Sequence, residues 1–137
     1  MRDDPLDITV RKLCAAASGL NMITLPAVTN IDTVVCNPQH WWEIFTLCVD
    51  NQGSEAIWAK FQLVGIDGAV NIAQAAVVEV SDGAHRAGRW IVREGQFLRC
   101  SVQSCTYNNL VVFTPMGIHH WMVEDYPDPG SDTPVQR

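Results

Sequence analysis

Hydrophobic and polar residues alternate most regularly in the middle of the chain, between positions 41 and 64. In the second half of this stretch every second position is apolar: Ile57, Ala59, Phe61 and Leu63. Lys60 and Gln62 lie between these positions, so one side of an extended chain is apolar and the other is polar. This period of two residues predicts a half-buried β-strand.

The first half of the stretch, residues 41–50, also predicts a strand. Apolar side chains fall on both of its faces: Phe45, Leu47 and Val49 on one, and Trp42, Ile44 and Cys48 on the other. A strand that is apolar on both faces is covered by other layers or by a neighbouring subunit. Asn51, Gly53 and Ser54 follow it and tolerate tight backbone conformations, which predicts a hairpin joining the two strands.

Similar short apolar runs continue along the rest of the chain. They predict strands over residues 8–17, 20–25, 32–36, 69–80, 90–93, 97–102, 110–113 and 118–123. Alanines leave a helix open as the alternative over residues 13–17 and 69–80, whereas the β-branched residues of both segments favour strand. Turns are expected at residues 65–68, 94–96 and 106–109 and a loop at 81–84 that closes at Gly88, with residues 97–102 pairing back onto 90–93. Pro115 and Gly117 are expected to interrupt the last apolar run.

Eight to ten short strands with turn signals every 8–12 residues are typical of an all-β fold. We therefore predict an antiparallel β-sandwich, jelly-roll-like, with a closed barrel as the alternative. A single domain is expected over residues 8–124. Residues 1–7 are expected to form a loose N-terminal arm, and residues 125–137 an extended acidic tail rich in proline.

Charge and composition restrict the classes of partner. The 137 residues include 15 Asp and Glu against 9 Lys and Arg, a net charge of −6, which disfavours nucleic acid. No run approaches the roughly 20 apolar residues of a membrane span, and the first residues do not resemble a signal peptide, so synthesis in the cytoplasm is expected. Charged residues make up 18% of the chain, below the usual ~25%, and five tryptophans add large apolar groups. This balance favours a surface that other chains cover.

Histidines and cysteines are the candidates for metal chemistry. His119 and His120 are adjacent, so on a strand they point to opposite faces and cannot chelate one ion together. Cys100 and Cys105 lack the second pair that a zinc site requires, and one buried and one loop cysteine are expected, with a bridge between them left open. We therefore expect no metal and no cofactor.

Catalytic signatures are also missing from the sequence. It contains neither Gly-x-Ser-x-Gly nor a glycine-rich phosphate loop. We therefore expect no catalytic residues and no enzymatic activity. Four arginines lie close together in the second half of the chain: Arg86, Arg89, Arg93 and Arg99. They could dock an acidic neighbour or the acidic tail, or be solvated.

The aromatic residues are the candidates for binding. Six of them are expected to be core or intersubunit anchors: Trp41, Trp42, Phe45, Trp58, Trp90 and Trp121. Trp41 and Trp42 place one indole on each face of their strand, so at least one is expected to face outward or into a partner. A sugar-stacking platform, and hence glycan binding, is the alternative interpretation of these tryptophans.

Three stretches carry a resemblance to a known group of proteins: Ile23-Thr24-Leu25-Pro26, residues 47–53 (Leu-Cys-Val-Asp-Asn-Gln-Gly) and residues 92–101 (Val-Arg-Glu-Gly-Gln-Phe-Leu-Arg-Cys-Ser). By the pattern of residues 20–123 the chain resembles the small jelly-roll-like accessory proteins of tailed-bacteriophage virions. These include capsid cement or decoration proteins and the bases of head or neck fibres. The resemblance implies a non-enzymatic virion protein, a homotrimer bound to the major capsid protein or to other virion proteins. A host-attachment module that binds carbohydrate is the alternative.

Overall fold

The computed structural model describes residues 2–14, 27–53, 56–78, 82–105 and 109–122, and within them the chain forms nine strands and no helix. The strands are β1 (Arg2–Asp7), β2 (Val10–Cys14), β3 (Ala27–Asp32), β4 (His40–Asn51), β5 (Ile57–Gly65), β6 (Gly68–Val78), β7 (Asp82–Val92), β8 (Phe97–Cys105) and β9 (Asn109–Trp121). The described residues therefore include no helix that could cross a membrane.

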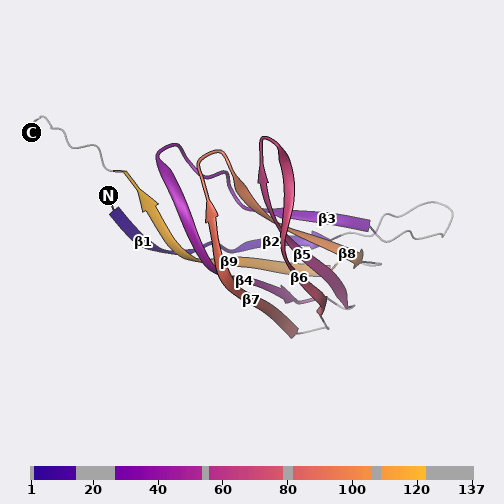
Figure 1. The fold of residues 1–137 in the computed structure, drawn as a ribbon. Helices are drawn as coiled ribbons and strands as arrows, with labels where there is room; N and C mark the ends of the chain where they lie inside the picture. Colours follow the sequence, from indigo (N-terminus) through magenta and orange to yellow (C-terminus); the bar gives the residue numbers. More distant parts are fainter. Residues whose placement is uncertain (1, 15–26, 54–55, 79–81, 106–108, 123–137) are drawn as a thin grey trace, which may run out of the picture.

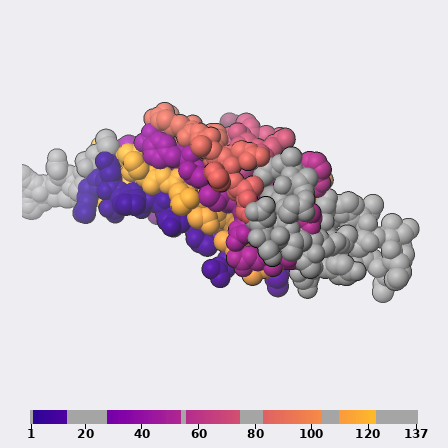
Figure 2. Space-filling view, turned by 90° about the horizontal axis from the view of Figure 1, so that it is seen from below, coloured from indigo at the N-terminus to yellow at the C-terminus, as the bar shows by residue number. Residues whose placement is uncertain are grey.

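The strands form two antiparallel sheets (Figure 1). One sheet has the order β1-β9-β4-β7, with β2 also paired to β9, and the other has the order β3-β8-β5-β6. Figure 2 shows β1 and β2 beside β9 along one face of the molecule, with β4 and β7 beyond them. The prediction of an all-β antiparallel sandwich is confirmed.

The pairing order is that of a jelly roll. Four antiparallel pairs are nested along the chain, namely β2 with β9, β3 with β8, β4 with β7, and β5 with β6. The ribbon then rolls up, so that β4 also pairs with β9 and β5 with β8. Nested pairs wound into two four-stranded sheets define the jelly roll, and β1 extends the edge beside β2.

The two edges of the sandwich are linked by long side chains. Lys12 on β2 donates from Nζ to the carbonyl of Asn30 on β3, at 2.9 Å. At the opposite edge, Arg86 on β7 donates from Nε to the carbonyl of Gln74 on β6, at 2.6 Å. Because each link joins one sheet to the other, both edges of the roll are partly closed.

Alternating side chains from both sheets fill the space between them. The largest fully buried residues are Phe61, Phe113, Ile31, Ile44, Leu47, Ile57, Leu98, Val49, Val92, Val102 and Val111. The rings of Phe61 and Phe113, from opposite sheets, stack with their centroids 5.8 Å apart. Cys36 and Cys100 are also buried, and burial raises the pKa of the Cys36 thiol to about 11. These two cysteines therefore behave as small core residues.

Because of a β-bulge at Phe45, the side chains of β4 point to other faces of the sheet than simple alternation predicts. The register shifts between Ile44 and Thr46 against both neighbouring strands. The extra residue turns the chain by one position, so Trp42 and Ile44 before the bulge and Leu47 after it all point into the core. Phe45 is left outside with 38% of its surface exposed. The expectation that Phe45 shares a face with Leu47 and Val49 is therefore wrong.

The strands on either side of Asn51 do not form the expected hairpin. β4 belongs to one sheet and β5 to the other, so the connection crosses between layers. The same correction applies to residues 97–102, because β8 pairs with β3 and β5 and not with β7. The true hairpin is β5 with β6, around the predicted turn at residues 65–68. Turn residues indicate where the chain reverses, but they do not decide whether its arms pair.

The last strand is not interrupted, although Pro115 and Gly117 lie within it. Pro115 lies opposite the gap between β1 and β2, and its carbonyl accepts from the N–H of Ile8 at 3.2 Å. A proline is tolerated there because no ladder bond is required from its nitrogen. Gly117 is opposite Ile44, beside the bulge, where the two backbones approach too closely for a side chain.

Other boundaries also differ from the expected ones. Residues 2–7, expected as a loose arm, form β1, which pairs with the end of β9. The strand expected at residues 32–36 lies earlier, as β3, and the loop expected at 82–84 with Gly88 is part of β7. Residues 69–78 form part of the strand β6 and not a helix, as the β-branched residues predicted. The predictions for residues 15–17, 20–25, 106–108 and 125–137 lie outside the described residues.

Candidate functional site

Polar and aromatic side chains gather at one end of the five-stranded sheet, where β1 and β4 begin and β9 ends. The register places Asp3, His120 and Trp41 side by side across these three strands. Because Trp42 next to Trp41 is buried, this row lies on the outer face of the sheet. The Trp41 indole stacks on the His120 ring, with centroids 5.1 Å apart and planes 14° apart.

A second group lies on the opposite face of the same strands. His40 Nδ1 and His119 Nε2 are 2.6 Å apart and share one hydrogen bond, which requires one ring to donate and the other to accept. Both rings pack against Trp121, and the guanidinium of Arg2 lies 5.4 Å from the centre of that indole. His119 and His120 thus have separate partners, as their predicted opposite directions require.

Alternating charges connect four side chains on the outer face. His120 Nδ1 is 2.6 Å from Asp3 Oδ1, and its Nε2 is 3.2 Å from Glu43 Oε1. The other oxygen of Glu43 accepts from Arg89 Nε at 2.6 Å. The hydrogen bond from Arg89, followed by that from His120, lowers the pKa of Glu43. The network joins β1, β9, β4 and β7, so it links the edge strands β1 and β7 to the two central strands.

The two adjacent histidines differ in the direction of their pKa shift. Burial opposes protonation of His120, but its bonds to Asp3 and Glu43 outweigh burial and raise its pKa above the ordinary value. Burial, with the neighbouring His40, lowers the pKa of His119. One ring therefore gains a proton more readily than a free histidine, and the other less readily.

We expect these shifts to appear as opposite effects on stability. Because the folded pKa of His120 is raised, its contribution is fully present below the unfolded pKa of about 6.5 and is lost as pH rises through the folded value. His119 acts in the opposite sense, and its contribution is lost as pH falls through its lowered pKa. Proton NMR should give a titration midpoint above 6.5 for His120 and below it for His119.

The matching mutational experiment replaces His120 by glutamine. The difference in unfolding free energy between wild type and His120→Gln should shrink as pH is raised through the midpoint of His120. The control is His85→Gln, which changes an exposed histidine of β7. A loss of stability for His120→Gln that is the same at every pH would contradict the ionised network.

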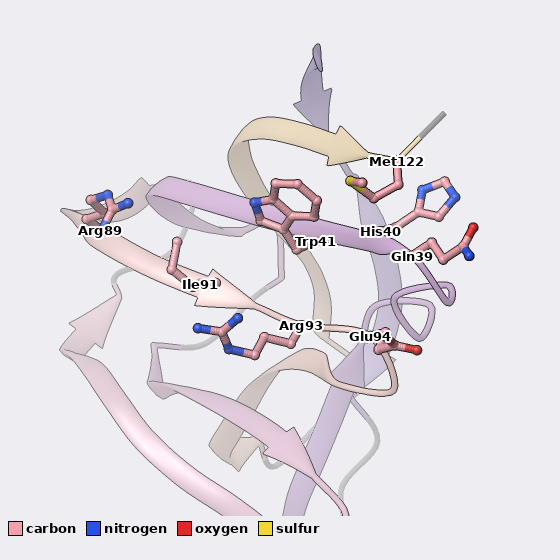
Figure 3. A pocket seen from close by; sticks show the side chains of 8 residues that line it. All are labelled: Gln39, His40, Trp41, Arg89, Ile91, Arg93, Glu94 and Met122. Atoms are coloured by element: carbon pink, nitrogen blue, oxygen red, sulfur yellow. The ribbon is translucent and has the colours of Figure 1, made fainter. Parts of the chain in front are cut away.

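A groove of about 720 Å³ lies beside the outer row, between the start of β4 and the end of β7 (Figure 3). It is lined by Gln39, His40, Trp41, Arg89, Ile91, Arg93, Glu94 and Met122. Figure 3 shows Trp41 from β4 facing Ile91 from β7 and Arg93 from the turn that follows β7 across this space. Trp41 and Ile91 provide apolar surface, and two arginines provide positive charge. The groove can therefore receive a group that is both flat or apolar and anionic.

A second depression, of about 670 Å³, lies on the other side of the turn between β7 and β8. Leu63, Ile66 and Val70 from the β5–β6 hairpin contribute its apolar lining, and Arg93 and Glu94 border both depressions. Ile66 is fully exposed at the hairpin tip. This end of the sandwich therefore presents apolar surface that the chain itself leaves uncovered.

The six predicted anchors occupy different environments. Trp42 is a core residue with 4% of its surface exposed, and Trp90 is half-buried against the core. Trp58, with 52% exposed, and Phe45 lie outside the core. Trp41 and Trp121 are half-buried beside the histidines.

The four arginines do not form one cluster. Arg89 bonds to Glu43, Arg99 to Asp32 with Nε and Oδ1 2.7 Å apart, and Arg86 to a backbone carbonyl, while Arg93 lines the groove. Asp3 and Glu43 were not candidates from the sequence. Only the pairing register, which brings residues 3, 43 and 120 together, identifies them.

The described part of the chain holds no group of three or more His, Cys, Asp or Glu residues arranged to bind a metal ion. No protein-family model matches the sequence, and no curated protein matches it. Among solved structures, the chain aligns over 93% of its length with 34% of a chain in a structure of infectious bursal disease virus, Gx strain, at 14% identity and a TM-score of 0.39. With a chain in a structure of the Gt strain of the same virus, it aligns over 86% of its length and 32% of that chain, at 12% identity and a TM-score of 0.31. The protein thus spans about a third of the length of these chains.

Proposed function

We propose that this protein is a non-enzymatic structural component of a virion, a cement or decoration protein that binds a capsid shell as an oligomer. The observation that carries the proposal is the jelly-roll strand order, the architecture of many viral capsid domains. The same architecture serves lectins, and a fold alone does not assign a function. The exposed surface of this chain supplies the second argument.

Large apolar side chains are exposed at several places on the sandwich. They are Leu13, Val28, Val34, Val35, Phe45, Trp58, Ile66, Val70 and Met122. Burial of such groups between subunits stabilises an assembly by about 25 cal/mol per Å² of apolar area. A standard interface buries roughly 1,600 Å² in total, of which association costs offset a large share. Trp58 on β5 and Ile66 and Val70 at the hairpin tip are the anchors that we assign to contacts with sister copies and the shell.

Light scattering after size exclusion tests the proposal. We expect an oligomer, a trimer of the 15.2 kDa chain, that co-sediments with capsid shells. Ile66→Asp and Trp58→Asp should lower the oligomer mass or abolish shell binding while the melting temperature stays close to wild type, since both side chains lie outside the core. Thr9→Asp, at an exposed position between β1 and β2, is the control. A monomer at all concentrations that ignores shells would contradict the proposal.

Carbohydrate binding is the second candidate, and Trp41 is the observation that favours it. Trp42, another of the five tryptophans considered for sugar stacking, lies in the core and cannot reach a ligand. Trp41 lines the open groove, where one side of its indole is supported by His120 and the ring can present its other side. A glycan array should then show binding that Trp41→Ala abolishes and Trp58→Ala preserves. Silence across the array would remove this candidate.

A further inference from the structure

The groove beside Trp41 has the chemistry of a peptide-binding site. Its apolar surface comes from Trp41 and Ile91, and the stacking of Trp41 on His120 fixes the orientation of the indole. Arg89 keeps 65% of its side chain exposed although it bonds to Glu43. Arg93 forms no ion pair within the described part of the chain. An extended segment with an aromatic or proline side chain and a carboxylate complements these groups.

Glu94 also borders the groove and sets a limit on this complementarity. Its carboxylate lies next to Arg93 in the sequence and repels an anion that approaches from the side of the β7–β8 turn. An acidic ligand is therefore favoured along the other part of the groove, between Trp41, Arg89 and the guanidinium of Arg93. Figure 3 shows Arg89 on one side of Trp41, and Glu94 on the other side together with Gln39 and Met122, where β9 ends.

The chain itself enters the groove at that point. Met122 lines it, and the Met122 N–H donates to the carbonyl of Gln39 at 3.0 Å. The residues that follow read Val-Glu-Asp-Tyr-Pro-Asp-Pro-Gly-Ser-Asp over positions 123–132. They carry four carboxylates, one tyrosine and two prolines, and no lysine or arginine. An extended chain advances about 3.3–3.6 Å per residue, so the four residues after Met122 span about 13–14 Å.

We propose that the acidic segment 123–132 of the same chain binds in this groove, with the tyrosine ring or a proline against Trp41 and a carboxylate on Arg93. The segment is joined directly to a lining residue, so its effective concentration at the groove is on the order of millimolar, far above that of a free ligand. Prolines limit the conformations that the free segment loses on binding. Arginine–carboxylate bonds are charge-assisted and can be bidentate. The inference is independent of the proposed virion role.

A glycan and the segment cannot occupy the same surface of Trp41 together, so glycan binding would require release of the segment. Because the attraction depends on exposed charges, binding of the segment should weaken as ionic strength increases.

Limited proteolysis of the full-length chain with a glutamate-specific protease tests the inference. The cleavage measured is that after Glu124, which a bound segment resists. Arg93→Gln should accelerate it about tenfold, the factor that corresponds to the loss of 1.4 kcal/mol and thus of one charge-assisted bond. Trp41→Ala should also accelerate it, and Arg11→Gln, at an exposed arginine of β2, should leave it unchanged.

Proton NMR of the same chain gives a second readout that does not depend on a protease. Nuclear Overhauser contacts are expected between the ring of Tyr126 and the indole of Trp41, and replacement of Glu124, Asp125 and Asp128 by their amides should remove them. Equal cleavage in wild type and Arg93→Gln, without these contacts, would overturn the inference. Protection that disappears on dilution would assign the segment to a second copy and also overturn it. Glycan binding that is equally tight with and without the acidic residues would count against it in the same way.

Discussion

Replacing Gly117 by alanine should destabilise the protein by about 3 kcal/mol or more. Overpacking that forces side-chain and backbone shifts costs about 1–3 kcal/mol, and a backbone obstacle belongs at or beyond the top of that range. A Cβ at this position would overlap the carbonyl of Glu43, and the Cα of Ile44 would also be too close. Because these are backbone atoms of the neighbouring strand, the paired strands must move apart. β4 and β9 are central in their sheet, so the strain reaches the core.

Urea denaturation followed by tryptophan fluorescence measures this effect. The control is Gly65→Ala, at the end of β5, where an added Cβ meets only the flexible side chain of Gln96 at 3.4 Å. We expect a change below about 1 kcal/mol for the control, since ordinary van der Waals contact requires no rearrangement. Similar midpoints for Gly117→Ala and Gly65→Ala would show that the two strands are not in close contact at the bulge.

Strands were predictable wherever local pattern and burial agree. In β5 the residues Ile57, Ala59 and Phe61 are buried, as the period of two predicts. In β6 the β-branched residues identified a strand despite several alanines. The turn at residues 65–68 was also evident, because it needs a glycine, and Gly68 adopts a φ of 109°. These features depend on a few adjacent residues, so they can be predicted from a single sequence.

The bulge and the pairing order were not predictable in this way. One extra residue at Phe45 reverses the faces of everything before it, and nothing in the local pattern marks that residue. Pro115 and Gly117 have the usual signature of a break, but a gap between two partner strands accommodates the first and a close backbone approach the second. Both outcomes depend on strands more than 60 positions away in the sequence.

The candidate site was only partly predictable for the same reason. The opposite directions of His119 and His120 follow from strand geometry alone. Their partners do not, because Asp3, His40 and Glu43 reach them only through the register of β1 and β4 on β9. The sequence also suggested that the arginines form one cluster. Arg86 and Arg89 lie in β7 and Arg99 in β8, and these two strands belong to different sheets.

The second large effect is expected from Phe61→Ala, at the centre of the core. Phe61 is fully buried and stacks on Phe113 across the two sheets, so its loss leaves a cavity and removes an aromatic contact. Truncation of a buried phenylalanine costs about 3–5 kcal/mol. Phe45→Ala is the matched control. It removes the same atoms from the bulge of β4, where the ring is partly exposed, and should cost about 1 kcal/mol.

Comparison of the two variants also tests the register of β4. If Phe45 belonged to the core face with Leu47 and Val49, as simple alternation predicts, Phe45→Ala would cost as much as Phe61→Ala. Thermal and urea unfolding should instead separate the two by at least 2 kcal/mol. The double variant Phe61→Ala/Phe113→Ala should cost less than the sum of its parts by about 0.5–1.5 kcal/mol, the coupling of one aromatic pair. Strict additivity would mean that the rings do not meet and that the two sheets do not face each other at this point.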